Sequence, residues 1–138
     1  MMTVDNKITV LDFGGQYAHL IAKRVRHLGV YADIKHPDAS LEELGRPGGI
    51  ILSGGPSSVY SDSAPPFNRE ILSAGIPILG LCYGMQLLAY LLGGDVHRLA
   101  RREYGRAELT VAGTSPLFDG LATHELVWMS HGDSVIRP

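Results

Sequence analysis

Cysteine is almost absent from this sequence of 138 residues, and its scarcity excludes two kinds of site. With a single cysteine, Cys82, the chain can form neither an internal disulfide nor a cysteine-rich metal site. Cys82 is therefore either a small buried apolar residue, which is the commoner environment of a free cysteine, or a reactive thiol. The residues around it have to decide between the two.

The sequence also lacks long apolar runs and an excess of basic charge. No run approaches the roughly 18 residues of a membrane span, and residues 1–9 have neither the charged start nor the apolar centre of a secretory signal. Twelve Lys and Arg against fourteen Asp and Glu give a net charge of -2, despite a local cluster of arginines within residues 98–106. We expect one cytoplasmic domain that binds neither nucleic acid nor membranes.

Short apolar runs alternate with helical patterns along most of the chain. Strands are predicted at residues 8–13, 30–35, 49–53 and 77–81. Helices are predicted at 17–28, at 41–44 behind a Ser40 cap, from Pro65 and Pro66 to a stop at Gly75, and through Met85, Leu88 and Leu92 up to Gly93. Further on, 103–111 and 125–129 are predicted to be antiparallel strands, with a turn or short helix at 117–121.

This alternation predicts an α/β fold with a doubly wound, mostly parallel sheet and helices on both faces. In such sheets, ligands bind at the edge where the strands have their carboxyl ends. The turns at Gly14, Gly54 and Cys82 each follow a predicted strand. We therefore expect all three turns to lie at one edge of the sheet.

Cys82 lies in the pentapeptide GLCYG at residues 80–84, between a predicted buried strand and a predicted helix. This pattern is typical of a nucleophile elbow, a sharp turn that projects the nucleophile outward and needs small flanking residues. The N-terminus of the following helix favours thiolate over thiol, so we expect a lowered pKa for Cys82. The context favours the reactive thiol.

Acyl transfer also requires hydrogen-bond donors for the oxyanion that develops on the substrate. An elbow supplies the backbone N–H of the residue after the nucleophile, here Tyr83. The SGGP turn at residues 53–56 ends a neighbouring strand, and its glycines let a backbone N–H approach a substrate closely, so Gly55 is our candidate for the second donor. An ordinary turn is the alternative interpretation of this segment.

Five segments together resemble class I glutamine amidotransferases, and within them the amidotransferase domains of the GMP synthase family, over essentially the whole chain. The segments are LDFGGQY at 11–17, LSGGP at 52–56, GLCYGMQ at 80–86, REYG at 102–105 and WMSHGD at 128–133. The resemblance implies that Cys82 attacks the side-chain carbonyl of L-glutamine, forms a glutamyl thioester and releases ammonia, after which water releases glutamate.

The resemblance also implies how the substrate is held. Gln86 is expected to contact the substrate glutamine, and the backbone of Ser130, His131 and Gly132 to hold its amino-acid end. Without the resemblance, Gln86 would be interpreted as a solvated helix residue.

The family's catalytic base is a histidine in a His-x-Glu pair downstream of the WMSHGD segment, and this sequence reaches Pro138 without such a pair. We therefore expect residues 1–138 to be the amino-terminal portion of a type 1 glutamine amidotransferase domain, incomplete at its C-terminus and inactive by itself. The histidines outside the matched segments are expected to be structural or exposed: His19, His27, His36, His97 and His124.

The resemblance implies a parent enzyme of guanine nucleotide biosynthesis that converts XMP to GMP with glutamine-derived ammonia. ATP and Mg²⁺ belong to its ATP-pyrophosphatase domain, on the same or a partner chain, whose phosphate loop this sequence lacks. We expect the full enzyme to be a homodimer and the present chain to hold neither a cofactor nor a metal.

Two other hypotheses remain open. The first is a non-catalytic module that binds glutamine or docks a partner, which the missing His-x-Glu favours. The second is a cysteine hydrolase or protease of similar sheet topology, which shares the elbow but does not account for the five segments together. Glutaminase activity measured on the chain separates the first hypothesis from a catalytic domain.

Overall fold

Helices and strands alternate along the chain in a computed structural model, which describes residues 5–14, 16–55, 59–62 and 64–137. The elements are β1 (Asp5–Leu11), α1 (Tyr17–His27), β2 (Tyr31–Lys35), α2 (Leu41–Leu44), β3 (Pro47–Leu52), η1 (Arg69–Ser73), β4 (Ile78–Gly80), α3 (Tyr83–Leu91), β5 (Asp95–Thr110), η2 (Pro116–Phe118) and β6 (His124–Arg137). Within β5 and β6, the stretches 98–104, 128–134 and 136–137 are described as backbone only.

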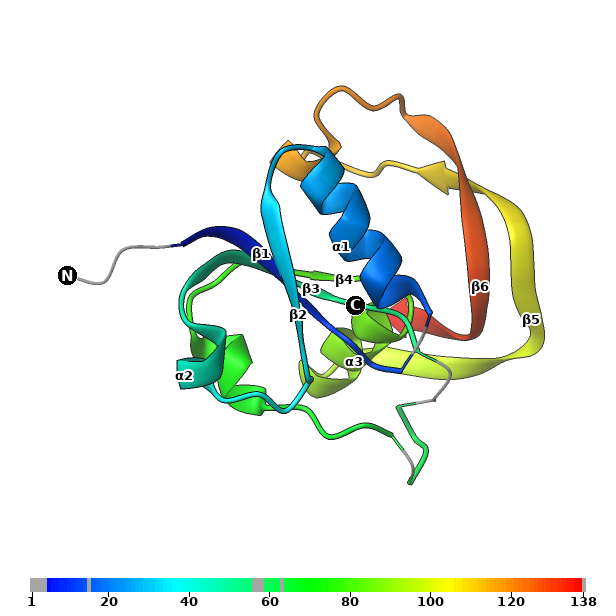
Figure 1. The fold of residues 1–138 in the computed structure, drawn as a ribbon. Coiled ribbons are helices and arrows are strands. Elements are labelled where there is room, and N and C mark those ends of the chain that lie inside the picture. The colour runs from blue at the N-terminus through cyan, green and yellow to red at the C-terminus, as the bar shows by residue number, and fades with distance from the viewer. Residues whose placement is uncertain (1–4, 15, 56–58, 63, 138) are drawn as a thin grey trace.

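Four strands form a parallel sheet in the order β2-β1-β3-β4 (Figure 1). The inner strand β3 contributes Ile50 and Leu52 to the core on one face, while Ile51 packs against the core on the other. This two-sided burial explains why its sequence is continuously apolar rather than alternating. The predicted central strand is confirmed.

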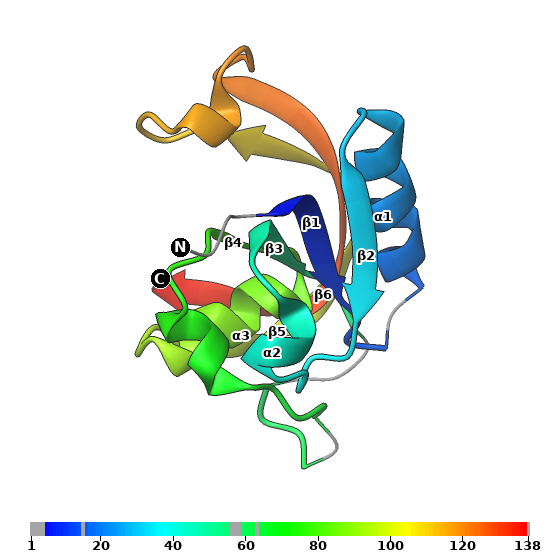
Figure 2. The ribbon, with the colours of Figure 1, turned by 60° about the vertical axis from the view of Figure 1, so that its left-hand side comes forward.

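Helices cover both faces of this sheet (Figure 2). On one face α1 packs through two small residues, Ala18 and Ala22, against Val10 and Ala32 of the sheet. On the other face lie α2, η1 and α3, and the larger core there includes Leu11, Phe13, Leu44, Ile50, Leu52, Ile71, Tyr83 and Leu87. The predicted α/β fold, a parallel sheet with helices on both faces, is confirmed.

The helix expected from Pro65 to Gly75 is wrong in type and length, because only the short 3-10 helix η1 forms there. Asn68 keeps an extended backbone (ψ 103°) and is held by the preceding loop: its N–H donates to Pro37 O, and its side-chain Nδ2 donates to Ala39 O. Too few residues then remain before Gly75 for regular α-helical turns. The Ser40 cap of α2 is confirmed, since its Oγ accepts from Glu43 N at 3.1 Å.

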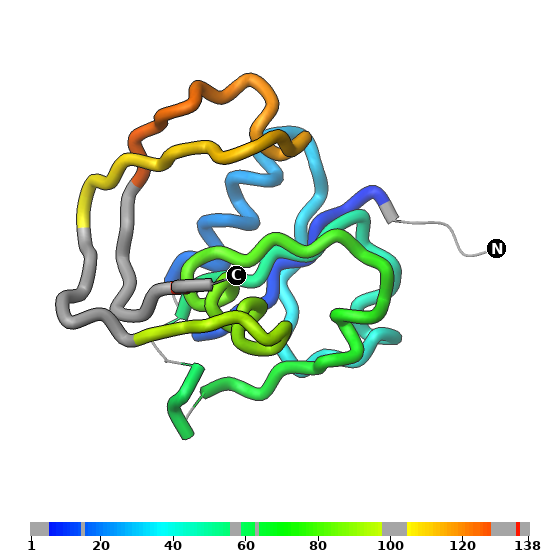
Figure 3. Tube along the Cα trace, turned by 180° about the vertical axis from the view of Figure 1, so that it is seen from behind, coloured from blue at the N-terminus to red at the C-terminus, as the bar shows by residue number. Residues whose placement is uncertain are grey.

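The last two strands, β5 and β6, pair antiparallel as a long ribbon outside the parallel sheet (Figures 1 and 3). The base of the ribbon is fixed to the core by Val96 and its neighbour in the register, Val135. Both strands are longer than predicted. The register shifts between Arg98 and Glu103, and this irregularity interrupts the alternation from which a strand is predicted.

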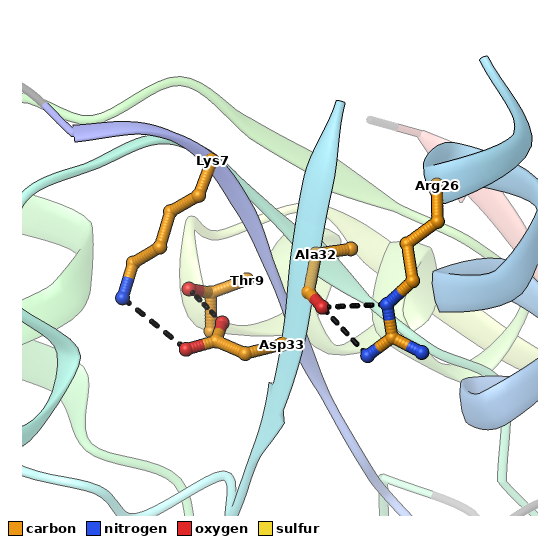
Figure 4. A network of polar contacts seen from close by, with 5 residues as sticks. All are labelled: Lys7, Thr9, Arg26, Ala32 and Asp33. Atoms are coloured by element: carbon orange, nitrogen blue, oxygen red, sulfur yellow. Dashed lines mark hydrogen bonds and ion pairs between the residues drawn. The ribbon is translucent and has the colours of Figure 1, made fainter. Parts of the chain in front are cut away.

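A polar network connects β1 and β2 at the β2 edge of the sheet (Figure 4). Asp33 of β2 accepts from the buried Thr9 hydroxyl at 2.7 Å and from Lys7 Nζ at 3.2 Å. On the opposite side of β2, Arg26 of α1 donates through Nε and Nη2 to the Ala32 carbonyl. These contacts fix α1 and β2 against β1 without a role at the carboxyl edge. None of the helices within the described ranges is long and apolar enough to cross a membrane.

Candidate active site

Three loops meet at the carboxyl edge of the parallel sheet. Leu11 of β1 is in register with Leu52 of β3, and Leu52 with Gly80 of β4. The residues that follow these three positions therefore emerge from the same edge. The predicted convergence of the turns at Gly14, Gly54 and Cys82 is confirmed.

Cys82 occupies a strained turn between β4 and α3. Its backbone has φ 51° and ψ −113°, and it is the one non-glycine residue with positive φ in the part of the chain that the structure describes. Such a conformation costs about 1–3 kcal/mol and persists only where the surroundings enforce it. The predicted elbow geometry is confirmed.

The two glycines of the elbow have a steric reason. A Cβ on Gly80 would lie 2.7 Å from the Gly84 carbonyl carbon and the Met85 nitrogen, and a Cβ on Gly84 would lie 2.4 Å from the Leu52 oxygen. Both contacts are with backbone, which cannot turn away. Glycine at these positions lets α3 begin directly against β3 and β4.

The Cys82 thiol is exposed and faces the loop after β3. A Cβ built on Gly54 would lie 3.3 Å from Cys82 Cβ and 4.0 Å from Sγ, so the backbone of that loop passes close to the sulfur. Burial raises the pKa of the Cys82 thiol. This direction is opposite to the lowered pKa expected from the helix N-terminus, because partial burial of the side chain disfavours the charged thiolate.

The two predicted oxyanion donors follow directly after Cys82 and Gly54, two residues whose backbones lie close together. Tyr83 is the first residue of α3 and Gly55 follows Gly54 in the facing loop. Within the described residues, neither backbone N–H donates a hydrogen bond. By contrast, the N–H of Gly84 donates to Leu81 O and that of Gln86 donates to Cys82 O. Both N–H groups thus have no hydrogen-bond acceptor among the described residues, and their role as oxyanion donors stays a prediction.

Gln86 lies one helical turn after Cys82 and is 3% exposed. The alternative of a solvated helix residue is therefore wrong. Burial of a side-chain amide costs free energy unless the amide is hydrogen-bonded, so Gln86 is not a surface residue that only contacts water. Its contact with substrate stays a prediction.

Ser130, His131 and Gly132 belong to β6, and their side-chain positions lie outside the described part of the chain. Their backbone pairs with another matched segment: Tyr104 is opposite Ser130, and Glu103 is opposite His131. The REYG and WMSHGD segments are thus neighbours in the ribbon. Their role in holding the amino-acid end of glutamine stays a prediction.

The five histidines expected to be structural or exposed are exposed: His19, His27, His36, His97 and His124. His36 pairs with Asp38, and His124 Nδ1 lies 2.9 Å from Glu108 Oε1. No hydrogen bond or ion pair connects a histidine to Cys82 within the described ranges. In the same ranges, no group of three or more His, Cys, Asp or Glu side chains is placed to hold a metal ion.

Two contacts of the site and one unpartnered hydroxyl were not anticipated from the sequence. Ser53 Oγ accepts from Phe13 N at 3.2 Å, and the Phe13 ring packs on the Tyr83 ring with centroids 5.3 Å apart. The Tyr83 hydroxyl is buried and has no hydrogen-bond partner, and burial raises the pKa of Tyr83. Phe13 and Ser53 both lie in the matched segments, which was the one available signal.

An exposed cysteine in a strained strand-to-helix turn, beside a glycine loop, has the form of the nucleophile site of cysteine-type acyl-transfer enzymes. The chain matches the class I glutamine amidotransferase family over residues 9–137, and it belongs to that family.

Its relatives include GMP synthases of the glutamine-hydrolysing type. The chain is 54% identical over 135 residues to that of Lactobacillus acidophilus and 49% identical over 132 residues to that of Aquifex aeolicus. These alignments cover 96% and 94% of this chain but only 26% of each relative, so the chain spans about a quarter of their length.

Two solved structures have the same fold. A putative GMP synthase subunit from Thermoplasma acidophilum superposes with a TM-score of 0.79 at 32% identity, over 94% of this chain and 66% of that one. A glutamine amidotransferase of Thermotoga maritima superposes with a TM-score of 0.73 at 24% identity, over 97% and 64% of the two chains, and shows the fold alone.

Proposed function

We propose that this chain carries the nucleophile and the oxyanion donors of a glutaminase site. The observation that carries the proposal is Cys82, whose strained backbone presents an exposed thiol at the start of α3, opposite Gly54. Strain in a non-glycine residue is concentrated at functional sites. Membership in the amidotransferase family supplies the substrate class, L-glutamine.

In the proposed reaction, the Cys82 sulfur forms a bond to the amide carbon of glutamine while the carbonyl electron pair moves to oxygen. The N–H groups of Gly55 and Tyr83 bind this oxyanion. The C–N bond then breaks, and the nitrogen takes a proton and leaves as ammonia. Water adds to the thioester, releases glutamate and restores the thiol.

The substrate itself is held away from the reacting bond. We propose that Gln86 contacts the bound glutamine and that the backbone of Ser130, His131 and Gly132 holds its amino-acid end. The burial of Gln86 one helical turn after Cys82 supports this role.

The reaction also needs a base for the thiol proton, all the more because burial raises the pKa of Cys82. No histidine among the described residues is bonded to the thiol. We propose that the base, a histidine oriented by a glutamate, comes from another part of the enzyme, and that residues 1–138 form an incomplete amidotransferase domain.

We further propose that the ammonia serves the conversion of XMP to GMP in purine biosynthesis. High identity to two GMP synthases supports this assignment. The ATP- and Mg²⁺-dependent activation of XMP would take place in an ATP-pyrophosphatase domain of the same or a partner chain, in a cytoplasmic enzyme that forms a homodimer.

Substitution of Cys82 in the enzyme that contains this domain tests the proposal. Cys82→Ala is expected to abolish GMP synthesis from glutamine and to preserve synthesis from added ammonia. Met85→Ala, a substitution of an exposed side chain three residues further along α3, serves as the control and should retain both activities. Equal loss of the two activities in Cys82→Ala would refute the assigned role.

A non-catalytic glutamine-binding or docking module is the second candidate. It is favoured by two observations: burial raises the pKa of Cys82, and no histidine among the described residues is bonded to the thiol. The longer enzyme separates the candidates, because the module predicts no effect of Cys82→Ala on glutamine-dependent synthesis.

A further inference from the structure

Phe13 lies at the point where the two oxyanion-donor segments meet. It lies two residues after Leu11, the last residue of β1, is 1% exposed, and belongs to neither the elbow nor the glycine loop. Its backbone contacts one segment and its ring contacts the other.

The backbone of Phe13 holds the loop after β3. Its N–H donates to Ser53 Oγ at 3.2 Å, and that hydroxyl in turn donates to Gly54 O at 3.2 Å. A Cβ built on Gly55 would lie 2.5 Å from the Phe13 carbonyl oxygen. The Gly55 backbone is therefore pressed against Phe13, and a shift of Phe13 would move it.

The ring of Phe13 holds the start of α3. It contacts the Tyr83 ring at a centroid distance of 5.3 Å and an interplanar angle of 49°. The Tyr83 hydroxyl is buried without a hydrogen-bond partner, so no polar contact anchors this ring. Its position is set by apolar packing, in which Phe13 is the aromatic neighbour.

We propose that Phe13 is a positioning residue that sets the separation of the Gly55 and Tyr83 N–H groups. The inference rests on the proposed glutaminase function and deepens it. Oxyanion donors act at about 2.7–3.1 Å, and removal of one donor reduces kcat by about 10²–10³-fold. A displaced donor should have a smaller effect of the same kind, on kcat rather than on substrate binding.

Two matched substitutions in the enzyme that contains this domain test the proposal. Phe13→Leu removes the ring contact with Tyr83 and retains an apolar side chain. Phe67→Leu is the control, because the Phe67 ring is the other aromatic neighbour of the Phe13 ring, with centroids 6.2 Å apart. In the ring contacts described, Phe67 touches neither of the two donor segments.

We expect Phe13→Leu to lower kcat for glutamine hydrolysis about tenfold while KM changes less than about twofold. Phe67→Leu should keep kcat within about twofold. The rate of Cys82 alkylation by iodoacetamide should be the same in both variants, because that displacement forms no oxyanion.

Three results would overturn the proposal: an equal loss of kcat in the two variants, a parallel loss of alkylation in Phe13→Leu, or a change confined to KM. If Phe13→Leu fails to fold, Ser53→Ala replaces it, since this change breaks the link between Phe13 N and the glycine loop and removes only one oxygen. It should also lower kcat at constant alkylation rate, and an unchanged kcat would overturn the proposal. Failure of the proposed function itself gives a different result, namely glutamine hydrolysis that persists in Cys82→Ala.

Discussion

Gly84 provides a sharp test of the elbow, because its helix position and its packing predict opposite effects of the same substitution. In an exposed helix, Gly→Ala stabilises by about 1 kcal/mol. Here the added Cβ would lie 2.4 Å from the Leu52 oxygen and 2.8 Å from the Leu52 carbonyl carbon. Both are backbone atoms of the inner strand β3, so relief requires α3 to move away from the sheet.

Overpacking of this kind costs about 1–3 kcal/mol, and a backbone clash belongs at the upper end. After subtraction of the helix gain, Gly84→Ala should lower the free energy of unfolding by about 2 kcal/mol. With an unfolding entropy of about 2.1 cal/mol/K per residue, this corresponds to a fall in Tm of about 7 °C for this chain.

Thermal unfolding followed by circular dichroism measures the effect, and Gly49→Ala is the matched control. A Cβ on Gly49 in β3 would meet the end of a flexible side chain, Ile8 Cδ1, at 3.1 Å. That atom can rotate away, so we expect a change of less than about 1 kcal/mol. A Gly84→Ala variant that is as stable as wild type, or more so, would refute the reasoning.

Three further predictions concern single side chains. Because burial raises the pKa of Cys82, alkylation of this chain by iodoacetamide should reach half its maximal rate at a higher pH than that of glutathione measured alongside; an equal or lower midpoint contradicts this. For the same reason, any contribution of the neutral thiol to stability is present below the ordinary thiol pKa and is lost as the pH rises through the raised one. Tyr83→Phe removes a buried hydroxyl without a partner and should raise the free energy of unfolding by about 1 kcal/mol in urea denaturation, whereas a decrease would reveal a hidden partner. Asp33→Ala leaves the buried Thr9 hydroxyl without its acceptor and should cost about 2 kcal/mol in the same assay, against less than about 0.5 kcal/mol for the exposed Asp38→Ala.

The parallel half of the fold could be predicted because its signals are local. The run around Ile50 is apolar on both faces, and Ser40 caps α2 through Glu43 N. The segment around Asn68 could not be predicted, because its extended backbone depends on hydrogen bonds to Pro37 and Ala39, which lie about thirty residues earlier in the chain. The ribbon was too short in the prediction because pairing between distant strands, not alternation, decides its length.

The site shows the same division. Cys82 and its flanking glycines were predictable, since a sharp strand-to-helix turn dictates residue types at fixed spacing. The direction of the Cys82 pKa shift was not predictable, because the helix N-terminus can be inferred from the sequence while the burial that raises this pKa cannot. The contact between Phe13 and Tyr83 joins residues seventy positions apart, and no local pattern predicts it.

Mass spectrometry of acid-quenched enzyme tests the central claim most directly. The enzyme that contains this domain is mixed with glutamine, quenched within one turnover and digested. The account predicts a glutamyl group on the peptide that contains Cys82, and its absence in Cys82→Ser. Glutamine hydrolysis without any adduct at Cys82, or with an adduct on another residue, would contradict it.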